Sequence, residues 1–210
     1  MKYEWRKQAK ALYLPPQTPT PITVPPFNYY TISGHGDPND IEFGERTAAL
    51  YAMAYGIRMM PKQGLTPDGY YEYTVFPLEG LWTLDPADVA ADGQFDKADL
   101  QYKIMLRQPD FVTPALAQEN LARISAKKPN PYNAEVQFET LTDGPSLQIL
   151  HLGSYDDEPA SFAKLASYAT EHGLKRRTLA HKEIYLSDPR RIVASKRKTV
   201  LRWLMTTDEA

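Results

Sequence analysis

Two stretches of the chain, NYYTISGHGDPN at residues 28–39 and LQILHLGSYDD at residues 147–157, follow one pattern. Each begins with an apolar run that favours a β-strand, and each then reaches a glycine with an aspartate three residues later. A helical periodicity follows both stretches and is predicted to end at Gly56 and Gly173. We interpret this recurrence as an internal duplication; the alternative is the chance similarity that any α+β protein shows.

The elements around the first stretch complete one module. Asn39 and Glu42 have the spacing of a capping box, which predicts a helix from there to Gly56. The pattern at residues 70–84 predicts one or two strands, and LQYKIMLR at residues 100–107 predicts another. The first module therefore has the order strand, helix, strand, strand.

A helix and a turn signal separate the two modules. The Thr-Pro pair at residues 113–114 predicts a helix that ends near residue 127, because Thr is a good N-cap and Pro suits the first turn. The strands predicted at residues 136–140 and 147–152 flank Asp143-Gly144. Both residues of this pair tolerate positive φ, so we expect a β-hairpin here.

The closing part of the chain repeats the order of the first module. Asp157 is predicted to cap a helix that Gly173 ends, and strands are predicted at residues 181–186 and 199–204. Both helices lead to a strand with a Tyr/Glu pair, so Glu183 in the second module corresponds to Glu72 in the first.

The N-terminal segment differs from the two modules. A short helix is predicted before Leu14, and six prolines between residues 15 and 26 predict an extended arm. We therefore expect a helix and arm at residues 1–20 and one domain at residues 21–206. The modules of that domain are placed at residues 21–110 and 111–206.

Composition excludes several classes of protein. No apolar run approaches the roughly 20 residues that span a bilayer, and the charged first ten residues lack a secretory signal, so we expect a cytoplasmic protein. A net charge of -2 argues against direct nucleic-acid binding. The chain has no Cys, and its four His lack the spacing of metal ligands, so neither a metal nor a cofactor is expected.

Two acids stand among apolar and aromatic residues, Glu79 in PLEGLW at residues 77–82 and Glu183 in HKEIYL at residues 181–186. In a strand, Glu183 and Tyr185 point to one face, and we expect Ile184 to face the helix layer from the other. The acid is either solvent-exposed or part of a concave surface. A desolvated carboxylate there has a raised pKa and serves as a general base, or it attracts a cationic planar ligand.

Aromatic residues and a methionine are candidates for the walls of such a site. Tyr155 is the best placed, because it occupies the turn between a strand and a helix, where its phenol is available to a developing oxyanion. The alternative for such residues is an ordinary place in the core. The further candidate ligand-binding residues are Glu79, Trp82, Tyr102, Met105, His151 and Tyr185.

Five segments together resemble the GyrI-like small-molecule-binding family, in particular its stand-alone branch that is similar to cyclopropanoid hydrolases. The segments are VPPFNYYTISGHGDPN (24–39), PLEGLW (77–82), YKIMLRQPDFVTP (102–114), LGSYDDEPASF (152–162) and HKEIYLSDPRR (181–191). The resemblance implies an α+β fold in which duplicated strand-helix-strand-strand (SHS2-type) modules form a curved antiparallel sheet. Helices lie on one side of this sheet and a ligand cleft on the other.

The resemblance also implies a function. Glu183 is the central pocket carboxylate and, with Tyr155, adds water to cyclopropane-containing DNA-alkylating toxins, while Trp82 and Tyr102 hold a hydrophobic aromatic ligand. The motif departs from the family pattern at Thr83, where a second aromatic residue is expected after LEGLW. The alternatives are a non-catalytic binder or sensor of lipophilic or cationic aromatic compounds and a protein-interaction role such as gyrase modulation. No membrane or direct nucleic-acid partner is implied.

Overall fold

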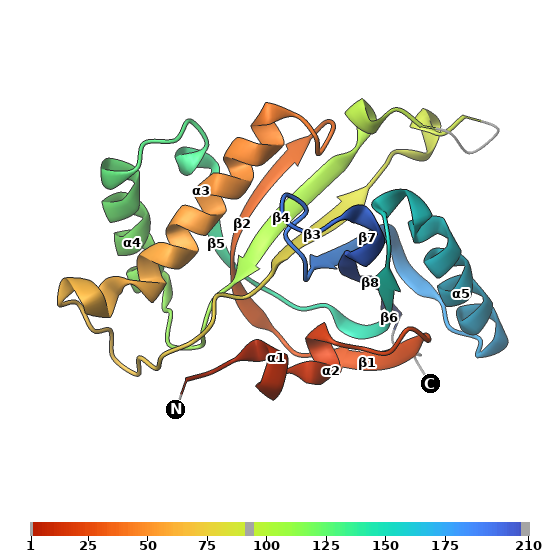
Figure 1. The fold of residues 1–210 in the computed structure, drawn as a ribbon, viewed down its shortest axis with the longest axis horizontal. Helices are drawn as coiled ribbons and strands as arrows, with labels where there is room; N and C mark the ends of the chain where they lie inside the picture. The colour runs from red at the N-terminus through yellow and green to blue at the C-terminus, as the bar shows by residue number, and fades with distance from the viewer. Residues whose placement is uncertain (1, 91–94, 207–210) are drawn as a thin grey trace. The chain divides into compact units, whose positions relative to one another are not determined.

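The computed structural model describes residues 2–90 and 95–206 (Figure 1). The helices are α1 (Trp5–Gln8), α2 (Lys10–Tyr13), α3 (Ile41–Arg58), α4 (Pro114–Lys127) and α5 (Glu158–Glu171). The strands are β1 (Thr20–Val24), β2 (Phe27–His35), β3 (Leu78–Thr83), β4 (Gln101–Arg107), β5 (Gln137–Leu141), β6 (Gly144–Leu152), β7 (Arg176–Tyr185) and β8 (Lys198–Met205). In the described residues, none of the helices combines the length and apolar character needed to cross a bilayer.

The chain folds into two compact units, each made of three separate segments of the sequence. Unit 1 comprises Met1–Glu4, Phe27–Phe76 and Thr83–Leu141. Unit 2 comprises Trp5–Pro26, Pro77–Trp82 and Thr142–Ala210. The break near residue 141 differs from the module boundary expected at residue 110, because α4 and β5 pack with α3 and β2 in unit 1.

Unit 1 places two helices against a short antiparallel sheet. β2 pairs on one side with β4 and on the other with β5, and α3 packs against β2 and β4. Gly56 lies inside α3, where an added Cβ would come 2.5 Å from Asn120 Oδ1 and 2.6 Å from Ile124 Cγ1. The prediction that Gly56 ends the helix is therefore wrong: its lack of a side chain lets α4 approach, and α3 continues to Arg58.

Unit 2 is a five-stranded antiparallel sheet in the order β1-β6-β8-β7-β3. α5 covers one face, where Leu165 and Ala169 pack with a cluster that includes Leu147, Leu201 and Trp203. α2 lies on the other face, since its backbone carbonyls accept hydrogen bonds from side chains of β6 and β8. Both faces of this sheet are therefore covered at its centre.

The two halves of the chain repeat one arrangement. Along the sequence, β2-α3-β3-β4 is followed by β6-α5-β7-β8, and the first strand of each set pairs antiparallel with the last, β2 with β4 and β6 with β8. The expected α+β fold with duplicated strand-helix-strand-strand modules and antiparallel strands is confirmed. The corresponding helices, α3 and α5, each pack against the strand that precedes them.

The hairpin predicted at Asp143-Gly144 does not form. β5 pairs with β2, whereas β6 pairs with β1 and β8, so the strands on either side of this turn have different partners. Gly144 does adopt the positive φ of 69° that the turn signal implied. The local signal therefore predicted the backbone conformation of Gly144, but it does not decide which strands pair.

Other N-terminal and central elements also differ in part from expectation. The first helix consists of two short helices, and the segment predicted as a proline arm contains the strand β1. Of the region at residues 70–84, only β3 is a strand. Glu72 precedes it and is half-exposed, with its carboxylate 2.9 Å from Arg58, so it does not occupy the position on a strand that Glu183 has on β7.

Candidate functional site

The side chains of β7 alternate between two differently built faces. Lys182 and Ile184 point to one face, and Glu183 and Tyr185 share the other, as strand geometry predicts. Glu183 lies opposite Leu201, which packs in the cluster that α5 covers. The expectation that Ile184 faces the helix layer is therefore wrong for α5, because α5 covers the Glu183 side of the sheet.

Glu183 is held by two hydrogen-bond donors. Its Oε1 lies 2.9 Å from Nε2 of His181, which donates because a carboxylate only accepts. Tyr185 Oη accepts a hydrogen bond of 2.8 Å from Trp82 Nε1, and the Tyr185 hydroxyl in turn donates to the Glu183 carboxylate. Burial, and next the charge of Glu183, raise the pKa of Tyr185 well above its ordinary value. This side chain therefore stays protonated and keeps the carboxylate in place.

Gly80 makes room for the indole in this chain of hydrogen bonds. It lies opposite Glu183 in the pairing of β3 with β7, and Trp82 lies opposite His181. A Cβ on Gly80 would come 2.6 Å from Trp82 Nε1. The glycine thus lets the ring lie flat along β3, with its N–H directed at Tyr185.

Tyr155 reaches the same group from the short turn before α5. Ser154 caps this turn by accepting from the backbone N–H of Asp156, and the ring of Tyr155 meets that of Tyr185 edge-on at 6.0 Å between centroids. The Arg197 guanidinium lies 5.2 Å from the Tyr155 ring centroid. Burial raises the pKa of Tyr155, and the positive charge of Arg197 opposes that rise.

Glu158 is a functional candidate that the sequence did not indicate. It is the first residue of α5 and only 6% exposed. Its Oε1 has no hydrogen-bond partner among the residues that the structure describes. Burial, followed by the charges of Glu183 and Asp156, raises the pKa of Glu158 to about 9, so at neutral pH this group is a protonated carboxylic acid.

His151 supports the turn that carries Tyr155. The imidazole is buried, with Nδ1 2.9 Å from Ser161 Oγ and Nε2 2.9 Å from the backbone oxygen of Ser154. Because a carbonyl only accepts, Nε2 is the protonated nitrogen and Nδ1 accepts from the Ser161 hydroxyl in the neutral ring. These bonds connect β6 to the residue before the turn and to the start of α5.

Glu79 lies on the opposite face from Glu183. Its Oε2 is 3.2 Å from Lys182 Nζ, which also contacts Asp143 Oδ1 at 2.7 Å, and Asp143 Oδ2 accepts from Arg202 at 2.8 Å. All four side chains are buried. Burial raises the pKa of Asp143, but Lys182 and Arg202 outweigh it and hold the value below normal. Glu79, a candidate ligand-binding residue, therefore lies apart from the Glu183 side chain.

Tyr102 and Met105 belong to unit 1. The ring of Tyr102 lies over Gly34, where an added Cβ would be 2.6 Å from it, and meets Phe43 edge-on at 5.1 Å between centroids. Its hydroxyl accepts a hydrogen bond of 3.5 Å from Arg46. Met105 is buried in β4. Of the expected site residues, the structure thus brings together Glu183, Tyr185, Trp82 and Tyr155 in unit 2.

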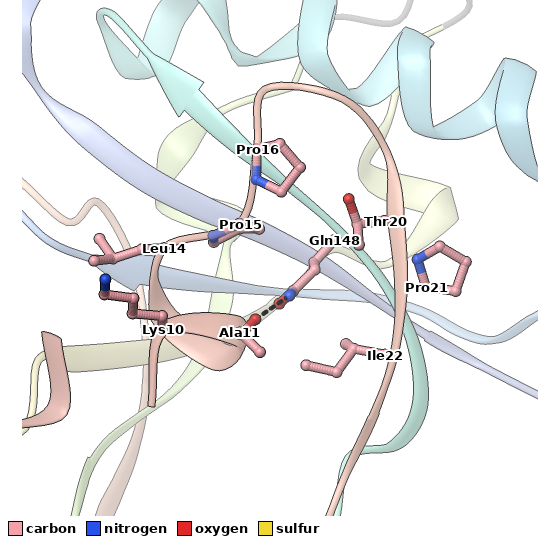
Figure 2. A pocket seen from close by; sticks show the side chains of 9 residues that line it. All are labelled: Lys10, Ala11, Leu14, Pro15, Pro16, Thr20, Pro21, Ile22 and Gln148. Atoms are coloured by element: carbon pink, nitrogen blue, oxygen red, sulfur yellow. Dashed lines mark hydrogen bonds between the residues drawn. The ribbon is translucent and has the colours of Figure 1, made fainter. Parts of the chain in front are cut away.

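A separate groove of about 300 Å³ lies beside α2 and β1 (Figure 2). Gln148 forms part of its wall and donates a hydrogen bond of 2.6 Å to the backbone oxygen of Ala11. Because Gln148 follows the opposite alternation from Ile149 on β6, this groove is on the face away from Glu183. Residues 2–90 and 95–206 contain no group of three or more His, Cys, Asp or Glu arranged to hold a metal ion.

Comparison with known proteins agrees with this architecture. The model of the GyrI-like small-molecule-binding domain matches residues 17–201. Over 97% of this chain and all of the other, a structure titled a hydrolase from Listeria innocua is 31% identical, with a TM-score of 0.87. An uncharacterized conserved protein from the same organism is 33% identical over the same shares, with a TM-score of 0.88.

More distant structures share the fold alone. The C-terminal domain of EcmrR is 10% identical, with a TM-score of 0.55 over 90% of this chain and 98% of that domain. No curated protein sequence matches the chain. The family match covers most of the 210 residues, and the chain therefore belongs to the GyrI-like small-molecule-binding family.

Proposed function

We propose that this protein hydrolyses cyclopropane-containing DNA-alkylating toxins by adding water, with Glu183 as the general base. The observation that carries the proposal is the Glu183 carboxylate, which is only 13% exposed and is oriented by His181 and Tyr185. A carboxylate fixed by two donors can accept a proton from a water molecule at a defined position. The hydrolase title of a structure 31% identical to this chain supports the same reading.

The chemistry uses groups that the site holds. Water attacks a carbon of the strained ring while Glu183 takes its proton, the carbon–carbon bond breaks, and the electron pair moves through the conjugated system onto a carbonyl oxygen. The resulting phenolate needs hydrogen-bond donors, and the Tyr155 hydroxyl is a suitable one. The Trp82 ring is 4% exposed and would form part of the apolar wall of a site for a flat ligand.

Turnover of a defined substrate tests the proposal. The protein is incubated with a spirocyclopropyl dienone alkylator, and the ring-opened alcohol is followed by chromatography. We expect wild type to accelerate hydrolysis and Glu183→Gln to lower kcat by about 10²–10⁴-fold, the usual contribution of a general base. Glu171→Gln, at the exposed end of α5, is the matched control and should behave like wild type.

Two outcomes would contradict the proposed mechanism. Equal rates for wild type and Glu183→Gln would remove Glu183 from the chemistry. Tight binding of the alkylator without product would support the non-catalytic alternative, in which the aromatic rings and the carboxylate bind a lipophilic or cationic aromatic compound.

A further inference from the structure

Glu158 is a buried carboxyl group to which the proposed reaction assigns no task. Its side chain belongs to the first turn of α5. The charge of Glu183 acts on it, and its own charge acts on Tyr155 and Tyr185, so these four side chains form one cluster. The residue is 94% buried, and Oε1 has no hydrogen-bond partner among the described residues. A buried polar atom left without a partner is costly, which points to a partner supplied by a ligand.

The neighbouring tyrosines are weaker proton donors than this group. Burial raises the pKa of Tyr155 and of Tyr185 above the phenol value of 10, whereas the Glu158 carboxyl has a pKa of about 9. The phenol that ring opening produces has an ordinary pKa of about 10. Proton transfer is most efficient when donor and acceptor are closely matched, and the carboxyl group meets that condition at neutral pH.

We propose that Glu158 is the general acid of this site, delivering the proton that neutralises the phenolate as the cyclopropane opens. The inference rests on the proposed hydrolase function. Water loses one proton to Glu183, its oxygen bonds to the ring carbon, and the phenolate oxygen gains one proton from Glu158. Transfer of a proton from Glu183 to Glu158 through solvent then restores both groups. Tyr155 acts as a hydrogen-bond donor to the same oxygen.

Other charged and titratable groups around Glu158 set the range of pH in which it acts. Glu183 faces it from β7 and Asp156 from the turn before α5, while Tyr155 and Tyr185 are neutral there. Both acids disfavour ionisation of Glu158. The rate should therefore decline as the pH rises through the pKa of Glu158, where the acid loses its proton.

The experiment compares wild type with Glu158→Gln, which has the same shape as the protonated acid and cannot transfer a proton. We expect kcat to fall about 10²–10⁴-fold with KM little changed. The loss should shrink to less than about tenfold for an electron-poor dienone, whose acidic phenol leaves without a general acid. Asp156→Asn is the matched control. Its kcat at neutral pH should equal that of wild type. Its alkaline decline should move to lower pH, because the charge that raises the pKa of Glu158 is gone.

The outcomes separate this inference from the function on which it rests. Wild-type turnover together with an unchanged kcat and alkaline decline in Glu158→Gln overturns the general acid and leaves the hydrolase intact. An equal loss of kcat for ordinary and electron-poor substrates also overturns it, since that pattern marks a structural role. Absence of product with wild type overturns the hydrolase function and this inference together. Thermal unfolding of Glu158→Gln confirms that the variant is folded.

Discussion

The two faces of β7 hold charge in opposite ways. On one face the Lys182 ammonium is neutralised by Glu79 and Asp143, and Arg202 completes a buried network of two cations and two anions. On the other face Glu183 is bound by His181 and Tyr185, and the neighbouring Glu158 has no hydrogen-bond partner on Oε1 in the described chain. Consecutive residues of one strand therefore enter very different environments.

This difference separates charged groups that stabilise the fold from charged groups that can exchange protons in a reaction. A buried network with matched charges has little reason to exchange protons, and removing one member is costly because the others stay buried. When two acids share one site, their different environments push their pKa values apart, and proteins use this to prepare an acid and a base. We therefore expect mutations on the Lys182 face to change stability and those on the Glu183 face to change chemistry.

The largest stability effect is expected from Lys182→Met. The variant leaves Glu79 without its cation and Asp143 with Arg202 alone, and breaking a buried pair in this way costs about 3–5 kcal/mol. Urea unfolding followed by circular dichroism measures the loss. Lys103→Met is the control, because the Lys103–Glu139 pair is partly exposed and should cost less than about 1 kcal/mol. Equal losses in the two variants would contradict the comparison.

The next largest effect is the pH dependence of the unfolding free energy that arises from Glu158. Its pKa is about 9 in the native state and 4.5 when unperturbed, so between these values the native protein holds a proton that the unfolded chain has released. Stability from this group is complete below pH 4.5 and is lost as the pH rises through 9. One proton gives at most about 1.4 kcal/mol per pH unit.

Unfolding free energies of wild type and Glu158→Gln, measured at pH 6 and pH 8, test this dependence. Wild type should lose up to about 2.7 kcal/mol more than the variant between these values. A constant difference between the two proteins across this range would show that Glu158 is ionised in the native state.

A moderate effect on stability is expected from Gly80→Ala. The new methyl group would meet Trp82 Nε1 at 2.6 Å and push the indole away from Tyr185, at a cost of about 1–3 kcal/mol. Turnover should fall as well, since Tyr185 then loses the donor that orients it. Gly44→Ala in α3 is the control: apart from its chain neighbours and the adjacent backbone of α3, no described atom lies within 4 Å of that Cβ, and Ala favours a helix by about 1 kcal/mol. A fully active Gly80→Ala would contradict this role.

The smallest effect is expected from Trp82→Phe, which keeps an aromatic ring and removes the N–H. The lost hydrogen bond to Tyr185 should cost about 0.5–1.5 kcal/mol. The pKa of Tyr185 should rise further, because that hydrogen bond lowers it. Ultraviolet titration of tyrosine ionisation detects the change, and an unaltered titration curve would show that the bond is absent in solution.

Local signals in the sequence predicted where helices and strands form better than they predicted which of them pair or pack together. Thr113 accepts a hydrogen bond from the N–H of Leu116, as an N-cap should, and α4 runs as expected. Gly144 has the positive φ that its sequence signal implied, but the pairing of β6 with β8 depends on residues 46–58 positions away and on a shared core. Gly56 was wrongly predicted to end α3, because the contact with α4 that requires a glycine there is also long-range and is not visible in the neighbouring residues.

Part of the candidate site was also predictable. The alternation of β7 placed Glu183 and Tyr185 on one face from the sequence alone. Which face α5 covers was not predictable, since both faces of the sheet carry apolar residues. Glu158 was missed because an acid in the first turn of a helix normally complements the helix dipole in water, and only the fold shows that this one is buried.

The prolines in and after β1 protect the edge of the unit 2 sheet from pairing with further strands. β1 pairs with β6, and it is the terminal strand of the unit 2 sheet in the described chain. Exposed edge strands invite pairing with other molecules and aggregation, and a proline interrupts the row of N–H donors on which such pairing depends. Pro21 lies inside β1, and Pro25-Pro26 follow it directly. This edge is therefore a poor template for a further strand, which favours a protein that stays dispersed at high concentration.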